Sequence, residues 1–476
     1  MSPALRAHEA GALHADGYGG PGWLAVPADV NTLVEPLWAR TVRRGADGAL
    51  EVGGVDVVRL AAEHGTPAYV VDEADLRARA RGFVTAFDDA FADLCGGADV
   101  YYAGKAFLCT AVARWVAEEG MLLETCTGGE LAVGLRAGVD PARMALHGNN
   151  KSDAEVERAL AAGVGRVVVD SLPEVDRVAD VAARLGVRAP VMVRVTVGVE
   201  AHTHSYIATA HEDQKFGVSL ATGEAARAVA AVLARPELDL RGLHSHIGSQ
   251  IFDVEGFEVA ARRLVRLHAT VQREHGVRLP EMDLGGGFGM AYTTQHRPMG
   301  PADLAAGMAR VVRAACAGEG VEVPRISVEP GRAVVGPSTF TLYTAGTTKD
   351  VALDDGGTRR YVAVDGGMSD NVRTALYAAD YSATLASRRS DAPPVLSRVV
   401  GKHCESGDVV VMDEFLPADL GHGDLVAVPG TGAYCRSLAS QYNHVPRPPV
   451  VAVADGTSRV LVRRETEDDL LALDVG

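Results

Sequence analysis

Short hydrophobic runs alternate with segments of helical period along the middle of the chain. A helix-like stretch at 72–87 precedes eight strand-like runs, and a helix-like segment follows each of the first seven. The runs cover residues 99–104, 121–126, 143–148, 166–171, 190–197, 240–247, 281–286 and 325–330. This alternation favours parallel pairing, and eight units are the number that closes a (β/α)8 barrel of the TIM type. We therefore predict an α/β barrel domain over residues 66–335.

The hydrophobic pattern changes after residue 335. Strand-like runs there are divided by Gly, Pro, Asp and Asn, which is typical of an all-β domain. We expect a mainly β, sandwich-like or barrel-like domain over residues 336–476. The N-terminal segment, 1–65, contains a hairpin-like run centred on Gly53 and Gly54, and we expect it to pair with this β domain or to stand as an extension. Residues 1–22, rich in Gly and Ala, are expected to be partly mobile.

Composition narrows the class of protein. The chain has 476 residues, a formal net charge of −16, and 47% hydrophobic and 23% charged residues, as globular proteins do. The acidic balance argues against nucleic acid as a partner, because affinity for phosphates needs clustered Lys and Arg. The N-terminal residues lack the features of a signal or transit peptide, and no run is long enough to span a bilayer. We therefore expect a cytoplasmic protein without a membrane partner.

One of the six cysteines lies in an unusual setting. None of the six forms a CxxC pair, so they fit neither a disulfide framework nor a zinc site, and most should be buried small side chains. Cys404, however, is flanked by His403, Glu405 and Asp408 in a polar loop rich in turn residues. A thiol there is more accessible and better able to transfer a proton than a buried one.

In a barrel of this kind, functional side chains gather at the carboxyl ends of the strands. Lys105 follows the first strand in an apolar and aromatic setting. It either reaches solvent, as most lysines do, or is an amine of lowered pKa that forms a Schiff base. Its position at a strand end favours the second interpretation.

Two loops near the end of the barrel are suited to binding a phosphate. Residues 245–250 follow strand six, and Gly285, Gly286 and Gly287 follow strand seven. Glycines also serve tight turns, but backbone N–H groups from two such loops can approach an anion closely at the usual phosphate site of a barrel. In an acidic protein, local amides of this kind are a way to hold a phosphate.

Glu329 follows the eighth strand. A carboxylate there is costly to bury unless a cation faces it, and a pyridinium nitrogen is such a cation; an ion pair with Arg332 is the ordinary alternative.

His246 is either a core residue or a ligand contact. A metal site is disfavoured because carboxylates are not spaced with the histidines as a facial triad requires. The histidines concerned are His202, His204, His211, His244 and His246.

Arg373 and Tyr377 are four residues apart, so they share one face if their segment is helical. Arg373 is able to clamp a carboxylate by a two-pronged hydrogen bond, and a surface salt bridge is the alternative.

A series of ordered motifs resembles the diaminopimelate decarboxylase family, in the fold-type III group of pyridoxal-phosphate enzymes. The motifs are YYAGKAF, HGNNKS, QKFG, HSHIGSQIFD, DLGGGFG, VEPGRA, VDGGMSDNVRTALY, GKHCESGD and PGTGAY. The resemblance runs from about residue 30 to the C-terminus. HGNNKS and CESGD favour this family over its ornithine and arginine decarboxylase relatives.

The resemblance implies pyridoxal 5'-phosphate as the cofactor and a role for each matching residue. Lys105 would form the Schiff base, His246 would stack on the cofactor ring, and Glu329 would pair with the ring nitrogen. The other residues that the resemblance places around the cofactor are Ser249, Gly285, Gly286, Gly287, Pro330, Gly331, Arg332 and Tyr434. One departure is Glu124, where relatives usually carry Asp, and it affects the geometry near Lys105.

The resemblance also implies a reaction, the decarboxylation of meso-2,6-diaminopimelate to L-lysine and CO2. Cys404 would be the proton donor. The substrate would bind to Arg332, Arg373, Tyr377, Glu405 and Tyr434. In this family the loop that carries the cysteine comes from the partner subunit, so a homodimer with shared active sites is expected.

Two alternatives remain open at the level of sequence. A decarboxylase of another basic amino acid, such as ornithine or arginine, would keep every cofactor residue and change only the substrate contacts. A non-catalytic pyridoxal-phosphate-binding homologue is the second, although the presence of both Lys105 and Cys404 argues against it. A racemase is a weaker third, because racemases of this fold use a tyrosine in place of the CESGD loop.

Overall fold

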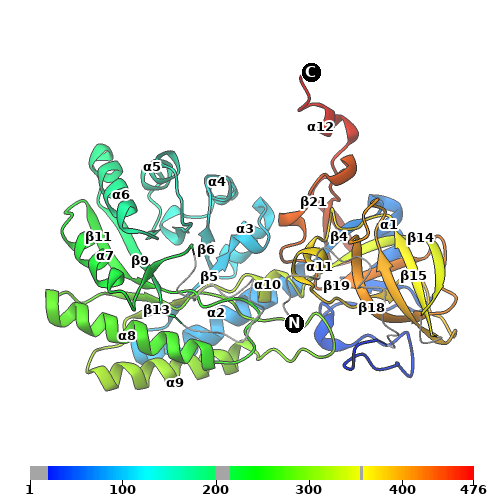
Figure 1. The fold of residues 1–476 in the computed structure, drawn as a ribbon, viewed down its shortest axis with the longest axis horizontal. Coiled ribbons are helices and arrows are strands. Elements are labelled where there is room, and N and C mark those ends of the chain that lie inside the picture. The colour runs from blue at the N-terminus through cyan, green and yellow to red at the C-terminus, as the bar shows by residue number, and fades with distance from the viewer. Residues whose placement is uncertain (1–19, 199–214, 354–356) are drawn as a thin grey trace. The chain divides into compact units, whose positions relative to one another are not determined.

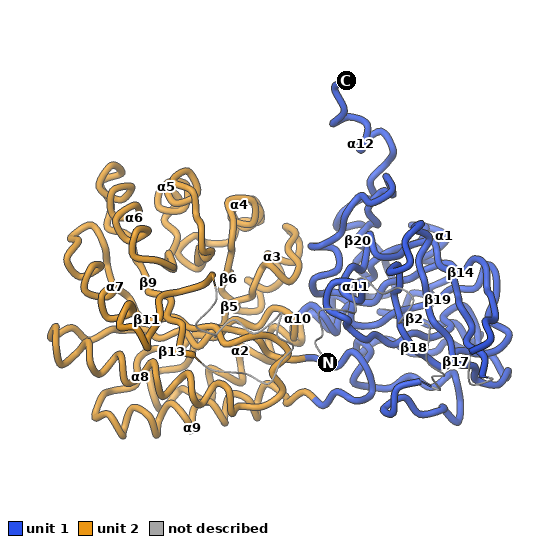
Figure 2. The backbone as a smooth tube through the Cα atoms, viewed as in Figure 1, with its two compact units in different colours: residues 1–76, 290–297, 335–476 blue, residues 77–289, 298–334 orange. Residues whose placement is uncertain are grey.

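The computed structural model describes residues 20–198, 215–353 and 357–476. Most of the segment expected to be mobile, and His202, His204 and His211, lie outside the described residues. The chain divides into two compact units (Figure 2). The barrel unit comprises residues 77–289 and 298–334, and the β unit comprises residues 1–76, 290–297 and 335–476.

The barrel unit is built on eight parallel strands, which confirms the predicted (β/α)8 fold (Figure 1). In barrel order they are β9 (Ala189–Thr196), β11 (Leu238–His244), β12 (Glu281–Asp283), β13 (Arg325–Val328), β5 (Ala98–Ala103), β6 (Leu122–Thr125), β7 (Met144–Leu146) and β8 (Arg166–Val169). Pairing of β8 with β9 closes the ring, and the short β10 (Val218–Ser219) also pairs with β9. Each strand overlaps one of the eight predicted runs.

A helix follows each barrel strand, and the longer helices cover the outside of the ring, whereas the four-residue α10 after β13 is buried (Figure 1). The helices are α2 (Glu73–Cys95), α3 (Thr110–Glu118), α4 (Gly128–Ala137), α5 (Asp153–Ala162), α6 (Leu172–Leu185), α7 (Glu224–Leu233), α8 (Glu255–His275), α9 (Pro301–Glu319) and α10 (Arg332–Val335), of which α2 precedes the first strand. Local sequence sets their ends. In α5, Ser152 and Glu155 form a reciprocal capping box, and Gly163 ends the helix with a left-handed φ of 81°.

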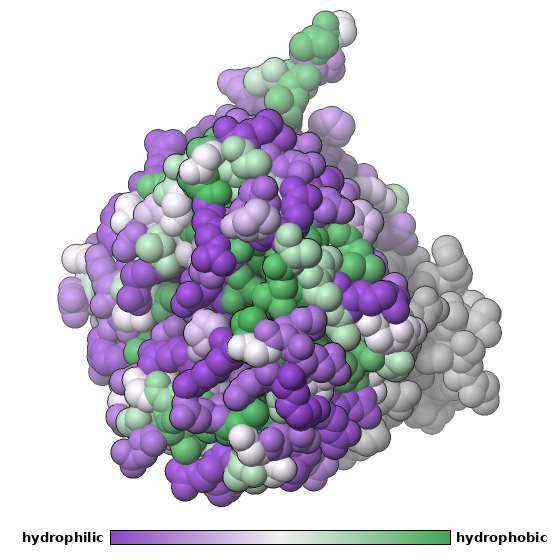
Figure 3. Space-filling model, turned by 90° about the vertical axis from the view of Figure 1, so that its left-hand side faces the viewer, coloured by the Kyte–Doolittle hydropathy of each residue, from purple (hydrophilic) through white to green (hydrophobic). Residues whose placement is uncertain are grey.

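On the face turned to the viewer in Figure 3, hydrophilic side chains predominate, and hydrophobic side chains gather in a smaller central area. This distribution follows from amphipathic helices. In α6, for example, Val175, Val178 and Ala182 are buried, whereas the polar positions between them face outward. No described helix has both the length and the hydrophobicity to cross a bilayer.

The β unit contains a mixed sheet, as the residues after 335 predicted. Its main path is β18 (Val409–Pro417), β17 (Pro394–Val400), β15 (Thr358–Val364), β14 (Thr339–Ala352), β4 (Ala68–Asp72), β20 (Val450–Ala454) and β21 (Thr457–Val462). Two further strands, β16 (Thr384–Leu385) and β19 (Leu425–Pro429), pair with each other, and β19 also pairs with β14. Most neighbours are antiparallel, whereas β15 with β17 and β4 with β20 are parallel.

The start of the predicted barrel, residue 66, differs from the observed boundary. β4 falls inside the predicted range of 66–335, yet it pairs with β14 and β20 of the β unit. Residues 290–297, from the loop after β12, also belong to the β unit. A buried hydrophobic strand such as β4 carries the same local pattern in either sheet, so only its long-range pairing decides where it goes.

The N-terminal hairpin-like run forms a short antiparallel hairpin, and its second strand leads directly into a helix. β2 (Leu50–Val52) and β3 (Val55–Asp56) are joined at Gly53 and Gly54, which both have positive φ, and β1 (Arg43–Arg44) pairs with β2. The chain then turns into α1 (Val57–His64), because the Asp56 side chain caps the first helical N–H groups. Apolar side chains of this segment share a core with those of β14 and β20; among them are Trp38, Leu50, Phe340 and Val451.

Candidate active site

Lys105 lies directly after β5, in a single 3-10 turn (η3, Gly104–Ala106), and is partly exposed. Its Nζ is 3.1 Å from Oε1 of Glu124, a buried residue of β6. Burial alone would raise the pKa of Glu124, but the Lys105 ammonium holds that pKa below its usual range. Glu124, which stands where Asp is usual in the resembling family, is therefore a direct partner of Lys105, the candidate Schiff-base lysine.

Glu329 is fully buried at the end of β13, among histidines. His244 Nε2 lies 3.0 Å from Glu329 Oε1, and His147 Nε2 lies 3.6 Å from the same oxygen. The two imidazole rings meet edge to face, with centroids 5.0 Å apart. Burial, and next the nearby Glu124, raise the pKa of Glu329 to about 8. A carboxyl group in this state needs a cation in order to stay ionised at neutral pH.

The predicted phosphate loops meet at the same end of the barrel. Gly285 and Gly287 have left-handed φ values of 71° and 104°, and a Cβ on either would clash with a backbone carbonyl of the loop after β11. Arg332, at the start of α10, donates from Nη2 to Ser249 Oγ at 2.8 Å. The N–H of Gly286 donates to His246 Nδ1 at 3.2 Å, and burial lowers the pKa of His246 well below its usual range.

These residues fit pyridoxal phosphate by the chemistry of their donor set. Lys105 supplies a primary amine for the aldehyde, and the glycine loops with Ser249 and Arg332 supply donors suited to a phosphate. Glu329 supplies the carboxylate for a protonated ring nitrogen, and because burial raises its pKa, a cation beside it would favour the ionised form. Pro330 and Gly331 lie between Glu329 and Arg332 in the turn that joins β13 to α10.

Two further charged residues at this end of the barrel were not predicted from the sequence. Asp283, the last residue of β12, accepts from the N–H of Gly285 at 2.7 Å and from Ser327 Oγ at 2.7 Å. Burial raises its pKa to about 7. Arg194, in β9, stacks on Phe216 with its guanidinium carbon 4.4 Å from the ring centroid. Asp283 could have been predicted from the sequence, because it is a charged residue at the carboxyl end of a barrel strand.

Arg373 is buried in the β unit, inside a cage of tyrosines. It opens the short helix α11 (Arg373–Tyr377), so the expected helical pairing with Tyr377 is present, at 6.0 Å from the guanidinium carbon to the ring centroid. Its Nη1 donates to Tyr381 Oη at 2.6 Å, and the guanidinium lies 4.7 Å from the ring centroid of Tyr292. Among the described residues no carboxylate forms an ion pair with Arg373, and its Nε has no hydrogen-bond partner.

The loop at 401–408 between β17 and β18 presents Cys404 and Glu405 to the surface of the single chain. Its base is anchored: the buried Asp408 accepts from the N–H of His403 at 2.7 Å and from the N–H of Met368 at 2.6 Å. The His403 ring is held by Ser369 Oγ at 2.8 Å. The thiol is thus exposed on a loop of fixed shape.

Tyr434 belongs to the β unit and is partly exposed. Its φ of 61° is left-handed, a conformation that costs a non-glycine residue of the order of 1 kcal/mol and is common at functional sites. Its neighbour Cys435 is buried, with Sγ 3.6 Å from Tyr381 Oη, the same hydroxyl that receives Arg373. The predicted cofactor residues other than Tyr434 thus lie in the barrel unit, whereas Tyr434, Arg373 and Tyr377 lie in the β unit.

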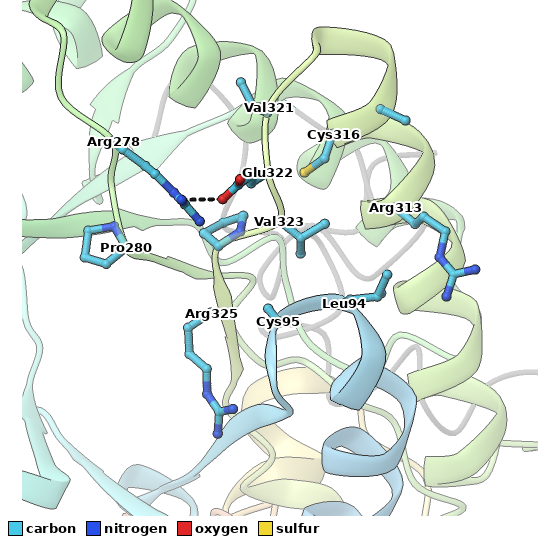
Figure 4. Close-up of a pocket in the computed structure, with 12 residues that line it drawn as sticks. Leu94, Cys95, Arg278, Pro280, Arg313, Cys316, Val321, Glu322, Val323 and Arg325 are labelled. Carbon is cyan, nitrogen blue, oxygen red and sulfur yellow. Dashed lines mark ion pairs between the residues drawn. The ribbon is translucent and has the colours of Figure 1, made fainter.

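A surface pocket of about 660 Å³ lies at the other end of the barrel (Figure 4). It is lined by residues at the ends of α2 and α9 and by the segments that lead into β12 and β13, including Cys95, Cys316 and Arg313. Arg278 and Glu322 form an ion pair across it (Figure 4). None of the predicted site residues lines this pocket, because they follow the carboxyl ends of the strands rather than the amino ends.

Comparison with known proteins agrees with this geometry. Residues 74–336 match the sequence family described as "Pyridoxal-dependent decarboxylase, pyridoxal binding domain". The chain is 53% identical over 447 residues to diaminopimelate decarboxylase from Mycobacterium bovis, covering 93% of this chain and 98% of that protein. It is 50% identical over 478 residues to the enzyme of the same name from Mycobacterium leprae, covering 99% and 100%.

A solved structure extends the likeness to three dimensions. The crystal structure of diaminopimelate decarboxylase from M. jannaschii in complex with L-lysine superposes with a TM-score of 0.85 at 29% sequence identity, covering 92% of this chain and 98% of that one. Sequence and fold therefore agree over nearly the full length of both chains. The chain belongs to the diaminopimelate decarboxylase family of pyridoxal-phosphate-dependent decarboxylases.

Proposed function

We propose that this chain decarboxylates meso-2,6-diaminopimelate to L-lysine and CO2, with pyridoxal 5'-phosphate as cofactor. The proposal rests mainly on the sequence identity of 50% or more to diaminopimelate decarboxylases over nearly the whole chain. It is also supported by Lys105 beside the buried Glu124, and by the buried Glu329, at the carboxyl end of the barrel. The bound cofactor supplies an electron sink that accepts the electron pair left when the carboxylate departs.

The chain's own residues prepare this chemistry. Lys105 would hold the cofactor aldehyde, and Glu124 at 3.1 Å keeps the amine in place. Glu329 would hold a proton on the ring nitrogen. The glycine loops, Ser249 and Arg332 would bind the phosphate. Cys404 would return a proton to the α-carbon, and His403, hydrogen bonded on both ring nitrogens, holds the loop beside it.

Arg373 is the proposed source of substrate specificity. A buried guanidinium without a carboxylate partner among the described residues is costly, and a carboxylate of the substrate would relieve that cost. Diaminopimelate has such a group at its distal end, whereas ornithine and lysine do not. An amino acid without a distal carboxylate would leave Arg373 unpaired, so the site would reject it.

The test is a comparison of substrates with the purified holoenzyme. We expect CO2 release from meso-diaminopimelate with formation of equimolar lysine, and kcat/KM values for ornithine, arginine and lysine lower by about 10³-fold or more. Equal turnover of ornithine or arginine would favour a decarboxylase of another basic amino acid. Cofactor absorbance without product from any of these amino acids would favour a non-catalytic homologue.

We also propose a homodimer with shared active sites. The support is the exposed position of Cys404 and Glu405 on an anchored loop, which leaves both side chains available to a second copy of the chain. If each site takes Lys105 from one chain and Cys404 from the other, Lys105→Ala and Cys404→Ala homodimers should both be inactive. Mixing the two under exchange conditions should restore about a quarter of wild-type activity, because half of the dimers are mixed and each has one intact site.

A mixture that stays inactive, although the two chains are seen to exchange, would show that each chain supplies both residues to its own site. Mass measurement of differently tagged subunits provides the exchange control.

Because the proposed reaction belongs to amino-acid biosynthesis, we propose the cytoplasm as its compartment, with the amino-acid substrate as the small-molecule partner.

A further inference from the structure

Two buried histidines at the end of the barrel have no role in the function proposed above. His244 is the last residue of β11, and His147 directly follows β7; both are at least nine-tenths buried. Burying two imidazoles costs free energy unless their polar atoms are used. Both point a ring nitrogen at one atom, Oε1 of Glu329.

These contacts link the two ends of the cofactor site. His147 Nδ1 lies 3.9 Å from Glu124 Oε1, the oxygen that contacts Lys105, and its Nε2 lies 3.6 Å from Glu329 Oε1. A row of polar groups therefore runs from the partly exposed Lys105 amine through the buried Glu124 and His147 to Glu329, and His244 closes it with a hydrogen bond of 3.0 Å.

We propose that His244, braced by His147, is a positioning residue that holds Glu329 in the orientation and protonation state that a cationic ring nitrogen requires. The inference rests on pyridoxal-phosphate binding and not on the identity of the amino-acid substrate. It would therefore survive a failure of the proposed reaction.

An imidazole is suited to this task because it can keep the hydrogen bond in either state of Glu329. The carboxylate accepts from Nε2–H, and the protonated carboxyl group can donate to an unprotonated Nε2. Burial lowers the pKa of His244 to about 4, so the ring is neutral at pH 7 and adds no competing positive charge. Its Nδ1 has no hydrogen-bond partner among the described residues, so Glu329 is the contact that fixes the ring.

Other charged and titratable groups bear on the same carboxylate, and they set the balance that His244 adjusts. Glu124 raises the pKa of Glu329, while Lys105 and Arg194 lower it. The groups that face Glu329 or His244 from neighbouring strands and loops are Lys105, Glu124, His147, Arg194, His246 and Asp283. A neutral donor can stabilise the carboxylate without disturbing this balance of charge.

The test compares cofactor affinity in two variants of the apoenzyme. His244→Leu removes the hydrogen bond, whereas His244→Gln keeps a group that can donate and accept. Each is titrated with pyridoxal phosphate and with the analogue in which C–H replaces the ring nitrogen, in the presence of EDTA, with bound cofactor followed by absorbance. The preference is the ratio of the affinity for pyridoxal phosphate to the affinity for the analogue. We expect this ratio to fall about tenfold in His244→Leu and to stay near the wild-type value in His244→Gln.

A parallel loss of affinity for both compounds would overturn the proposal, because a packing defect does not distinguish nitrogen from C–H. An unchanged preference would overturn it as well. A double-mutant cycle with Glu329→Gln sharpens the result: if His244 acts through Glu329, its removal should cost no further preference in that background. His244→Ser serves in the same titrations if His244→Leu does not fold.

Discussion

Replacing Lys105 by alanine is expected to lower CO2 release from diaminopimelate by about 10³-fold or more, because the substitution removes both the covalent attachment of the cofactor and an amine that can transfer protons. Pyridoxal phosphate should still bind through the phosphate loops and Glu329, but its visible absorbance should no longer be that of a Schiff base with the protein. Turnover is measured by CO2 release and lysine formation, and the cofactor is followed by its spectrum.

Lys349 provides the matched control. It is an exposed lysine of β14, in the β unit, and Lys349→Ala should leave turnover and spectrum unchanged. Undiminished turnover in Lys105→Ala would remove Lys105 from the reaction. A loss of turnover with an unchanged Schiff-base spectrum would assign the covalent link to another lysine.

Replacing Arg373 is expected to have the second largest effect, and the effect should depend on the substrate. In Arg373→Leu we expect kcat/KM for diaminopimelate to fall by about 10²-fold or more, because the distal carboxylate loses a charged, two-pronged partner. The turnover of lysine or ornithine is expected to be small in the wild type. It should not fall together with that of diaminopimelate, because neither amino acid has a distal carboxylate for Arg373 to bind. Discrimination between substrates should therefore narrow, which a comparison of kcat/KM for each amino acid will show.

Arg373→Lys separates charge from shape. Lysine keeps the positive charge but lacks the planar fork that Arg373 presents among Tyr292, Tyr377 and Tyr381, so it should restore only part of the loss. Arg389, an exposed arginine of the same unit, is the control for loss of positive charge. An equal fall for every substrate would mean that Arg373 supports the fold of the β unit rather than the recognition of a carboxylate.

The barrel could be predicted from the sequence because its information is local. Each strand is a short hydrophobic run followed by an amphipathic helix, and capping residues such as Ser152 mark where helices begin. The same locality explains the errors at its borders. β4 has the pattern of any buried strand, and its place beside β14 and β20 depends on pairing partners more than 250 residues away in the sequence.

The candidate site divides in the same way. Lys105, Glu329 and the glycines at 285–287 were predictable because strand ends in a barrel converge, whatever the details of packing. Tyr292 and Tyr381 carried no signal of this kind, since nothing in the local sequence indicates that they enclose Arg373. Glu124 was noticed only as a departure from relatives, and its contact with Lys105 appears only in the folded chain.

The sequence by itself determined the order of the elements, the residue types at the strand ends, and the family, since all of these are written in local patterns and ordered motifs. Only the tertiary structure decided which of those side chains contact one another. His244 and His147 both contact Oε1 of Glu329, and Glu124 joins this cluster to Lys105. These contacts form because closure of the barrel brings together strands that lie far apart in the chain. Burial within that closed ring is what raises the pKa of Glu329 and lowers that of His244, because it removes water from around both groups.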